Sequence, residues 1–217
     1  MKMYSGHYRN IMSSPSTGEP TIHPDFPNFL KTVYETGVVP NYTTNGIILA
    51  SDTKQSEELL EATRNYVGGV AVSYGNKRIR SQADRAIEKL IEKGECKIMI
   101  HHLISDKTSV DELLEAENKW GDKIHYHVLL PLKQHGRSKE EMTEEAYLYL
   151  VDKIKEYSLT NLAFGMWFLP WMKKYPGSID CWEYPGETYS SNLLLKDGKV
   201  IITPSSYDLR VVGVGKK

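Results

Sequence analysis

Cysteine is scarce in this chain of 217 residues, and that scarcity removes one class of protein at the outset. Cys96 and Cys181 are the two cysteines, and they lie far apart in the sequence. Small secreted domains that depend on disulfides need a denser and more regular set of cysteines. The sequence therefore does not predict a disulfide framework.

Net charge and long apolar runs are also lacking. The formal net charge is −1, which gives no long-range attraction to phosphate backbones, so nucleic acid is not favoured as a partner. The most apolar run, Leu162 to Met172, is shorter than the roughly 18 residues of a membrane span and contains a proline. The first ten residues lack the apolar core of a secretion signal. We expect a cytoplasmic protein with no membrane segment.

Strands and helices alternate along the chain, which has 40% hydrophobic and 25% charged residues, the composition of a globular protein. Strand-length apolar runs are separated by stretches with helical periodicity. Strands are expected at 10–14, 38–44, 68–74, 96–104, 123–130 and 161–168. Helical stretches are expected at about 26–37, 51–69, 81–95, 108–122 and 143–158, with N-caps at Ser81, at Thr108 or Ser109, and at Thr143.

This alternation predicts an α/β fold with a parallel sheet and right-handed crossovers. We expect a partial parallel (β/α) barrel of TIM type with about six strands, spanning residues 1–175. Ligands of such sheets bind at the carboxyl ends of the strands, which directs attention to 16–20, 43–46, 73–76, 101–105 and 130–134. A small-molecule ligand is the expected partner.

Residues 176–217 have no helical period and predict a β-rich extension. Two short strands joined through Asp197 and Gly198 form a strong hairpin signal. We expect this extension to cover one end of the sheet. At the opposite end, the exposed edge of the first strand is a place for pairing with a second copy or a partner chain.

Four pieces of sequence, in order, resemble the radical S-adenosylmethionine (radical SAM) superfamily. They are "TGEPTIHPDF" from Thr17, "YTTNG" from Tyr42, the strand ending "VAVSY", and the helix holding "RAIEKLIEKG". The likeness runs from about residue 10 to about residue 135. Its most specific piece is the Gly-Glu-Pro turn, which is similar to the family's GGE motif with Thr17 at the first glycine.

The resemblance implies a site for S-adenosylmethionine (SAM). Thr17, Gly18, Glu19 and Pro20 match the turn that binds the amino group of its methionine part, and glycine and proline suit a sharp turn with a fixed exit. Asn45 follows the next strand, Ser73 matches a position near the ribose or the carboxylate, and Ile104 matches an apolar position near adenine. The carboxylate would pair with Arg78, Arg80 or Arg85.

The family's chemistry requires a [4Fe–4S] cluster on three cysteines spaced CxxxCxxC, and this chain has no such triplet. In relatives the triplet lies in a unit before the GGE turn, where only residues 1–9 are available here. A truncated gene or mis-set start, an expressed fragment, or a natural cluster-free descendant would each explain the difference. We expect no cluster and no reductive cleavage of SAM by this chain as given.

Two other functions fit the sequence. One is a non-catalytic protein that keeps the pocket for a nucleoside-like ligand or a protein partner. The other is a metal-dependent hydrolase, in which His101, His102, His125 and His127, close together on two strands, would be the metal ligands. Strand histidines are more often packed residues with one hydrogen bond each.

Overall fold

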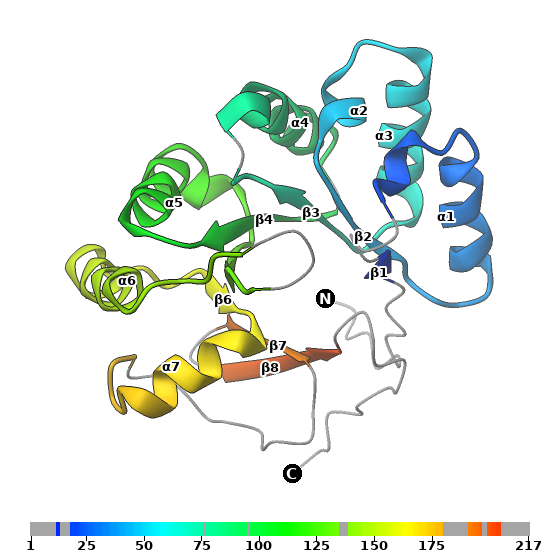
Figure 1. The fold of residues 1–217 in the computed structure, drawn as a ribbon. Helices are drawn as coiled ribbons and strands as arrows, with labels where there is room; N and C mark the ends of the chain where they lie inside the picture. Colours follow the sequence, from blue (N-terminus) through cyan, green and yellow to red (C-terminus); the bar gives the residue numbers. More distant parts are fainter. Residues whose placement is uncertain are drawn as a thin grey trace.

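A computed structural model describes residues 12–13, 18–75, 77–94, 96–134, 139–179, 191–196 and 199–204. Within them an α/β fold is formed, with the strands inside and the helices outside (Figure 1). No described helix is both long enough and apolar enough to cross a membrane.

One sheet contains every described strand, in chain order from β1 to β8. Neighbouring strands from β1 to β6 run parallel, while β7 is antiparallel to β6 and β8 to β7. The sheet is open, as in a partial barrel, so the predicted fold class is confirmed. The strands are β1 Met12–Ser13, β2 Asn41–Thr44, β3 Gly69–Ser73, β4 Lys97–Ile104, β5 Tyr126–Pro131, β6 Leu162–Phe164, β7 Ser191–Lys196 and β8 Lys199–Pro204.

Helices α1 to α6 lie between consecutive parallel strands, α7 lies between the antiparallel β6 and β7, and together they form an arc around the outside of the sheet (Figure 1). The α-helices are α1 Phe26–Glu35, α2 Ile47–Ala50, α3 Lys54–Tyr66, α4 Arg80–Lys93, α5 Lys107–Trp120, α6 Glu144–Tyr157 and α7 Leu169–Lys174. Short 3-10 helices are η2 Pro20–Ile22, η3 Lys77–Ile79, η4 Gly121–Lys123 and η5 Met166–Phe168. The five predicted helices are present, whereas α2 and α7 were not predicted.

Alternation along the strands creates two faces with different roles. On β4, Ile98, Ile100, His102 and Ile104 are buried, and the residues between them are partly or fully exposed. The buried set packs with the helices, and we call that side of the sheet the helix face. The opposite side, which includes His101 and Leu103, is called the inner face.

Two apolar clusters fill the space between the sheet and the helices. One joins β2, β3 and the first half of β4 to α1 through α5, and the other joins the end of β4, β5 and β6 to α5 and α6. Burial of this much apolar surface supplies the main favourable term for folding. It also holds the strand ends in fixed register, which is what a site built across several strands requires.

Helix caps differ in detail from the predictions. Helix α4 already begins at Arg80, so Ser81 lies inside the helix. Helix α5 is capped by Asp106, whose side chain accepts a hydrogen bond from the Ser109 N–H in a capping box, so neither Thr108 nor Ser109 is the cap itself. Thr143 caps α6 as predicted and accepts from the Ala146 N–H. The apolar run at 161–168 is a strand only from Leu162 to Phe164.

The hairpin strands β7 and β8 lie where the tail pattern predicted them, although Asp197 and Gly198 are outside the described residues. Through β7 the hairpin continues the sheet beside β6.

Candidate functional site

The Gly-Glu-Pro turn leads the chain into η2 at the end of the sheet where ligands of parallel sheets bind. Gly18 has φ of +109°, a conformation that glycine adopts without steric cost. Glu19 then caps η2, its Oε1 atom accepting from the N–H and the hydroxyl of Thr21 at 3.3 and 2.6 Å. Pro20 is the first residue of η2, and because proline has no backbone N–H, it leaves no unpaired donor there. Thr17 lies outside the described residues.

The Glu19 carboxylate also ties this turn to the end of β2. Its Oε1 atom accepts from the Thr44 hydroxyl at 2.7 Å, and its Oε2 atom accepts from the Asn45 N–H at 2.7 Å. Two sequence motifs 25 residues apart are therefore joined through one side chain.

The turn after β2 has its own internal hydrogen bonds. The Thr44 hydroxyl oxygen accepts from the Gly46 N–H, and the Asn45 side-chain oxygen accepts from the Ile47 N–H. Gly46 has φ of +80°, and a Cβ atom added there would lie 3.0 Å from the Cβ of Ala86 in α4. Glycine is therefore required at this position both for backbone conformation and for the approach of α4.

Glu19 keeps acceptor capacity on one oxygen. Its Oε1 atom already receives three hydrogen bonds, whereas Oε2 receives one from within the described residues. A carboxylate oxygen has two lone-pair positions, so Oε2 can accept one more donor. A ligand ammonium group at this place would form a charge-assisted hydrogen bond with Oε2.

Ser73 ends β3 one strand further along. Because Thr44 is the register partner of Val72, Asn45 and Ser73 are the next residues on their two strands and lie at the same level. Ser73 in turn pairs with His101 of β4. The structure thus brings Glu19, Asn45 and Ser73 into one row across the strand ends, and His101 extends the row. We call these four residues the strand-end row.

Arg80 is already engaged with two carboxylates. Its guanidinium lies 2.9 Å from Glu112 and 3.0 Å from Glu115 of α5, and above the ring of Tyr74. Arg85, also in α4, forms an ion pair with Asp52, which lies between α2 and α3. A ligand carboxylate would have to compete with these partners to pair with Arg80.

Ile104 is fully buried on the helix face, in the cluster with Val110 and Leu113 of α5. Its side chain therefore contributes to the core and lies on the opposite face of β4 from His101. The apolar residues that β4 and β5 place on the inner face at this level are Leu103, which is 47% exposed, and its register partner Leu130. The sequence directed attention to the ranges that contain them, 101–105 and 130–134, but did not single them out, because every position near the end of β4 is apolar or histidine.

The four strand histidines do not converge. His101 lies on the inner face and His102 on the helix face, because adjacent strand residues alternate. The His125 Nδ1 atom accepts from the Ile98 N–H. Among the described residues, no group of three or more histidine, cysteine, aspartate or glutamate side chains is arranged to hold a metal ion.

His102 instead belongs to a buried chain of polar groups on the helix face. Its Nε2 atom lies 2.8 Å from Nδ1 of His127, and Nε2 of His127 lies 2.8 Å from Oε2 of Glu117 in α5. Burial and the neighbouring His127 lower the pKa of His102 well below its ordinary value. The hydrogen bond with His127 lowers the pKa of Glu117. These three polar side chains link β4, β5 and α5 on the helix face, whereas the strand-end row includes His101 of the inner face.

The cysteines do not fit a four-iron cluster. Cys96 packs partly buried against the apolar cluster of the helix face, and burial raises the pKa of its thiol to about 11. Cluster ligation requires thiolates, commonly three or four together. Cys181 lies outside the described residues, and the whole sequence has no third cysteine.

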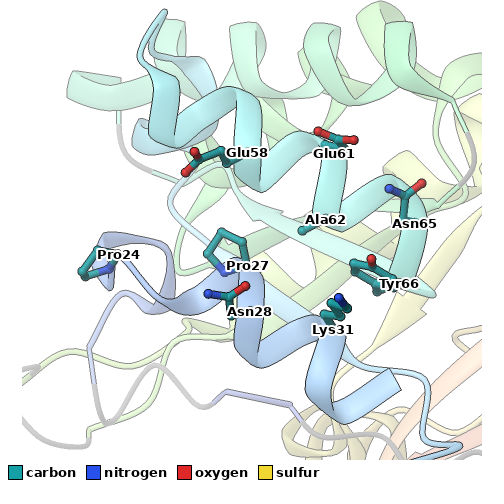
Figure 2. A pocket seen from close by; sticks show the side chains of 9 residues that line it. All are labelled: Pro24, Pro27, Asn28, Lys31, Glu58, Glu61, Ala62, Asn65 and Tyr66. Atoms are coloured by element: carbon teal, nitrogen blue, oxygen red, sulfur yellow. The ribbon is translucent and has the colours of Figure 1, made fainter. Parts of the chain in front are cut away.

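A surface hollow of about 310 Å³ lies between α1 and α3, on the outside of the molecule (Figure 2). Glu58, Glu61 and Asn65 on α3 face Pro27 and Lys31 on α1 across it. This hollow is formed by the helix layer and contains none of the predicted site residues.

Comparison with known proteins gives a match at the level of fold. A scan against sequence models of protein families finds none that matches, and a search of curated proteins finds no relative. Among solved structures, the chain is similar to Streptococcus suis SuiB bound to S-adenosylmethionine, with 19% identity and a TM-score of 0.53. It is also similar to SuiB bound to precursor peptide SuiA, with 18% identity and a TM-score of 0.54, and to SuiB itself, with 20% identity and a TM-score of 0.54.

These matches cover 77% to 79% of this chain but 41% to 42% of SuiB, so the chain spans less than half the length of that protein. At this identity the matches show a likeness of fold alone, and that fold is radical SAM-like. The sequence resemblance and the structural similarity agree on this point although they rest on different observations.

Proposed function

We propose that this chain binds S-adenosylmethionine, or a nucleoside closely related to it, at the strand-end row. The observation that carries the proposal is the Glu19 carboxylate, held by Thr44 and Asn45, with one acceptor position on Oε2 that no described residue fills. The similar fold of SuiB is known with SAM bound, which supports the same class of ligand.

The described residues supply complementary groups for the parts of such a ligand. Glu19 offers a negative acceptor for the ammonium group, and Ser73 offers a hydroxyl one strand further along. Leu103 and Leu130 provide apolar surface on the inner face for a base. Gly18 and Pro20 hold the turn that presents Glu19, and Arg80 is available to a ligand carboxylate only by exchange with Glu112 or Glu115.

Calorimetric titration with SAM and with the unreactive S-adenosylhomocysteine tests the proposal. The native chain is expected to bind both, and Glu19→Gln is expected to weaken binding at least tenfold, because a charge-assisted hydrogen bond contributes roughly 1.5–3 kcal/mol. Glu61→Gln, on the outer hollow between α1 and α3, is the matched control and should bind as the native chain does. Absence of heat with the native chain at millimolar ligand would overturn the proposal.

We further propose that this chain alone does not cleave SAM reductively. The residues present do not fit a four-iron cluster, since two cysteines cannot supply its three thiolates. Anaerobic reconstitution with iron and sulfide, followed by absorption spectroscopy and an assay for 5′-deoxyadenosine, tests this. A stable cluster together with 5′-deoxyadenosine formation would contradict it.

A further inference from the structure

His101 is the outermost member of the strand-end row, and its position is set by the register of the sheet. It lies beside Ser73 on the neighbouring strand, and the Tyr74 N–H donates to its carbonyl oxygen. Two strand spacings, about 10 Å in total, separate the end of β2 from β4 at this level. A ligand that starts at Glu19 and lies along the row would pass Ser73 and then reach His101.

The side chain of His101 is polar in apolar surroundings. Its register partner on β5 is Val128, and the next inner-face residues on its own strand are Met99 and Leu103. Within the part of the chain that the structure describes, neither imidazole nitrogen has a hydrogen-bond partner, and the same is true of the Ser73 hydroxyl. A partly buried polar group without a partner is costly unless a ligand or water satisfies it.

Burial lowers the pKa of His101 to about 4. The imidazole is consequently neutral at pH 7, with one nitrogen donating and the other accepting. Such a group suits an uncharged hydroxyl, which can both donate and accept, better than a carboxylate or an ammonium group.

We propose that His101 hydrogen-bonds a ribose hydroxyl of the nucleoside bound at the strand-end row and acts as a specificity-determining residue beside Ser73. This inference rests on the proposed function and extends it, because it adds His101 of β4 to the sugar contact that the resemblance implied for Ser73. It also explains the polar residue in an otherwise apolar stretch of the inner face.

Calorimetry with matched probes tests the assignment. The probes are S-adenosylhomocysteine and its 2′-deoxy and 3′-deoxy analogues, titrated into the native chain, His101→Leu and His101→Gln. Met99→Leu is the control, since it changes an inner-face residue on the same strand two positions away from His101. Thermal unfolding of each variant establishes that it is folded.

His101→Leu is expected to bind S-adenosylhomocysteine five- to tenfold more weakly, the effect of about one hydrogen bond. In the native chain, one of the deoxy analogues should show a similar loss. In His101→Leu that loss should disappear, because the partner of the missing hydroxyl is absent, whereas His101→Gln should keep part of it. Met99→Leu should bind all three probes as the native chain does.

Native affinity in His101→Leu, or an unchanged penalty for the deoxy analogue in that variant, would overturn the inference. If Glu19→Gln loses binding while His101→Leu does not, the proposed function stands and the inference alone fails. If the native chain binds no probe, both fail. Should His101→Leu not fold, the imidazole nitrogen resonances of the native chain give a second readout: they should shift on titration with S-adenosylhomocysteine, and unchanged resonances would refute the contact.

Discussion

The Asn45 N–H donates a hydrogen bond to Oε2 of Glu19 over 2.7 Å, and this contact joins the two most specific motifs of the chain. It makes Glu19 both a structural residue and a candidate ligand-binding residue. Oε1 is saturated by Thr21 and Thr44, while Oε2 accepts from one donor, Asn45, within the described part of the chain and has a second acceptor position. The two roles therefore belong largely to different oxygens of the same carboxylate.

Glu19→Ala is expected to lower the free energy of unfolding by about 2–4 kcal/mol, because several donors lose a charged acceptor. Glu19→Gln keeps one carbonyl acceptor and should lose about half as much. Urea unfolding at pH 7 measures both. Glu61→Ala, which removes an exposed carboxylate from α3, should change stability by less than about 0.5 kcal/mol. Stability equal to native in Glu19→Ala would show that the hydrogen bonds contribute nothing to folding.

Gly46→Ala is expected to destabilise the fold for two reasons that a second variant separates. Gly46 and Gly37 share a φ of +80°, but a Cβ at Gly37 meets nothing within 4 Å, whereas one at Gly46 lies 3.0 Å from the Cβ of Ala86. Gly37→Ala should therefore lower the free energy of unfolding by about 1–2 kcal/mol, which is the cost of placing a residue with a Cβ atom in the left-handed conformation.

Gly46→Ala should cost about 1–3 kcal/mol more than Gly37→Ala, because α4 must move away from the turn. Chemical unfolding of the two variants side by side gives the difference. Equal losses would mean that α4 accommodates the added methyl group and that its contact with the turn is loose.

Sequence reasoning located the helices well because their signal is repeated over several turns. The apolar positions Leu30 and Val33, for example, indicate both the existence of α1 and the face that it buries. The single turn of α2 and the short α7 gave no comparable signal. α7 follows the 3-10 helix η5 and has a proline in its first turn. The predicted strand 161–168 included the residues of η5, and 169–174 was assigned to no element.

Strand faces were harder to predict than strand positions. Around His101 and His102, apolar residues occur on both sides of β4, so the pattern does not indicate which set faces the helices. That choice is made by α5, which packs on Ile104. The sequence therefore predicted that Ile104 lies near the end of β4 but not which face its side chain is on. The ion pairs of Arg80 with Glu112 and Glu115 join residues more than 30 positions apart, and no local sequence pattern indicates them.

Asp84 accepts hydrogen bonds from two aromatic residues and connects three elements. Its Oδ1 atom accepts from the Tyr74 hydroxyl at 2.7 Å and the Trp120 indole N–H at 3.0 Å, and Oδ2 lies 2.8 Å from the Lys119 ammonium. Asp84→Leu leaves both aromatic donors without an acceptor and should cost about 2–4 kcal/mol. Asp84→Asn keeps one acceptor and should cost about 1 kcal/mol.

Thermal and urea unfolding of the two Asp84 variants measure this ranking. A loss in Asp84→Asn as large as that in Asp84→Leu would attribute the stability to the ion pair with Lys119 rather than to the aromatic donors. Substitution of Lys119 by Gln is the matched control and should cost no more than about 1 kcal/mol, because the ion pair is partly exposed.

Acid should destabilise the protein between about pH 6.5 and pH 4, because of His101 and His102. Burial lowers the pKa of His101 to about 4 and, together with His127, lowers that of His102 well below its ordinary value. The unfolded chain binds protons at these histidines from about pH 6.5 downward, while the folded chain does not. Each histidine therefore contributes stability that is fully present above pH 6.5 and is lost as the pH falls.

The expected slope is up to about 1.4 kcal/mol per pH unit for each histidine. The lowered pKa of Glu117 adds a loss of the same sign at more acidic pH, below its ordinary value. Urea unfolding at pH 7.5, 6 and 5 measures the slope. His101→Gln should reduce the slope by the contribution of one histidine, because glutamine does not titrate. Met99→Leu changes no titratable group and should leave the slope unchanged. An identical slope in His101→Gln would mean that the His101 imidazole is solvated, and it would also weaken the case for a neutral imidazole facing a ribose hydroxyl.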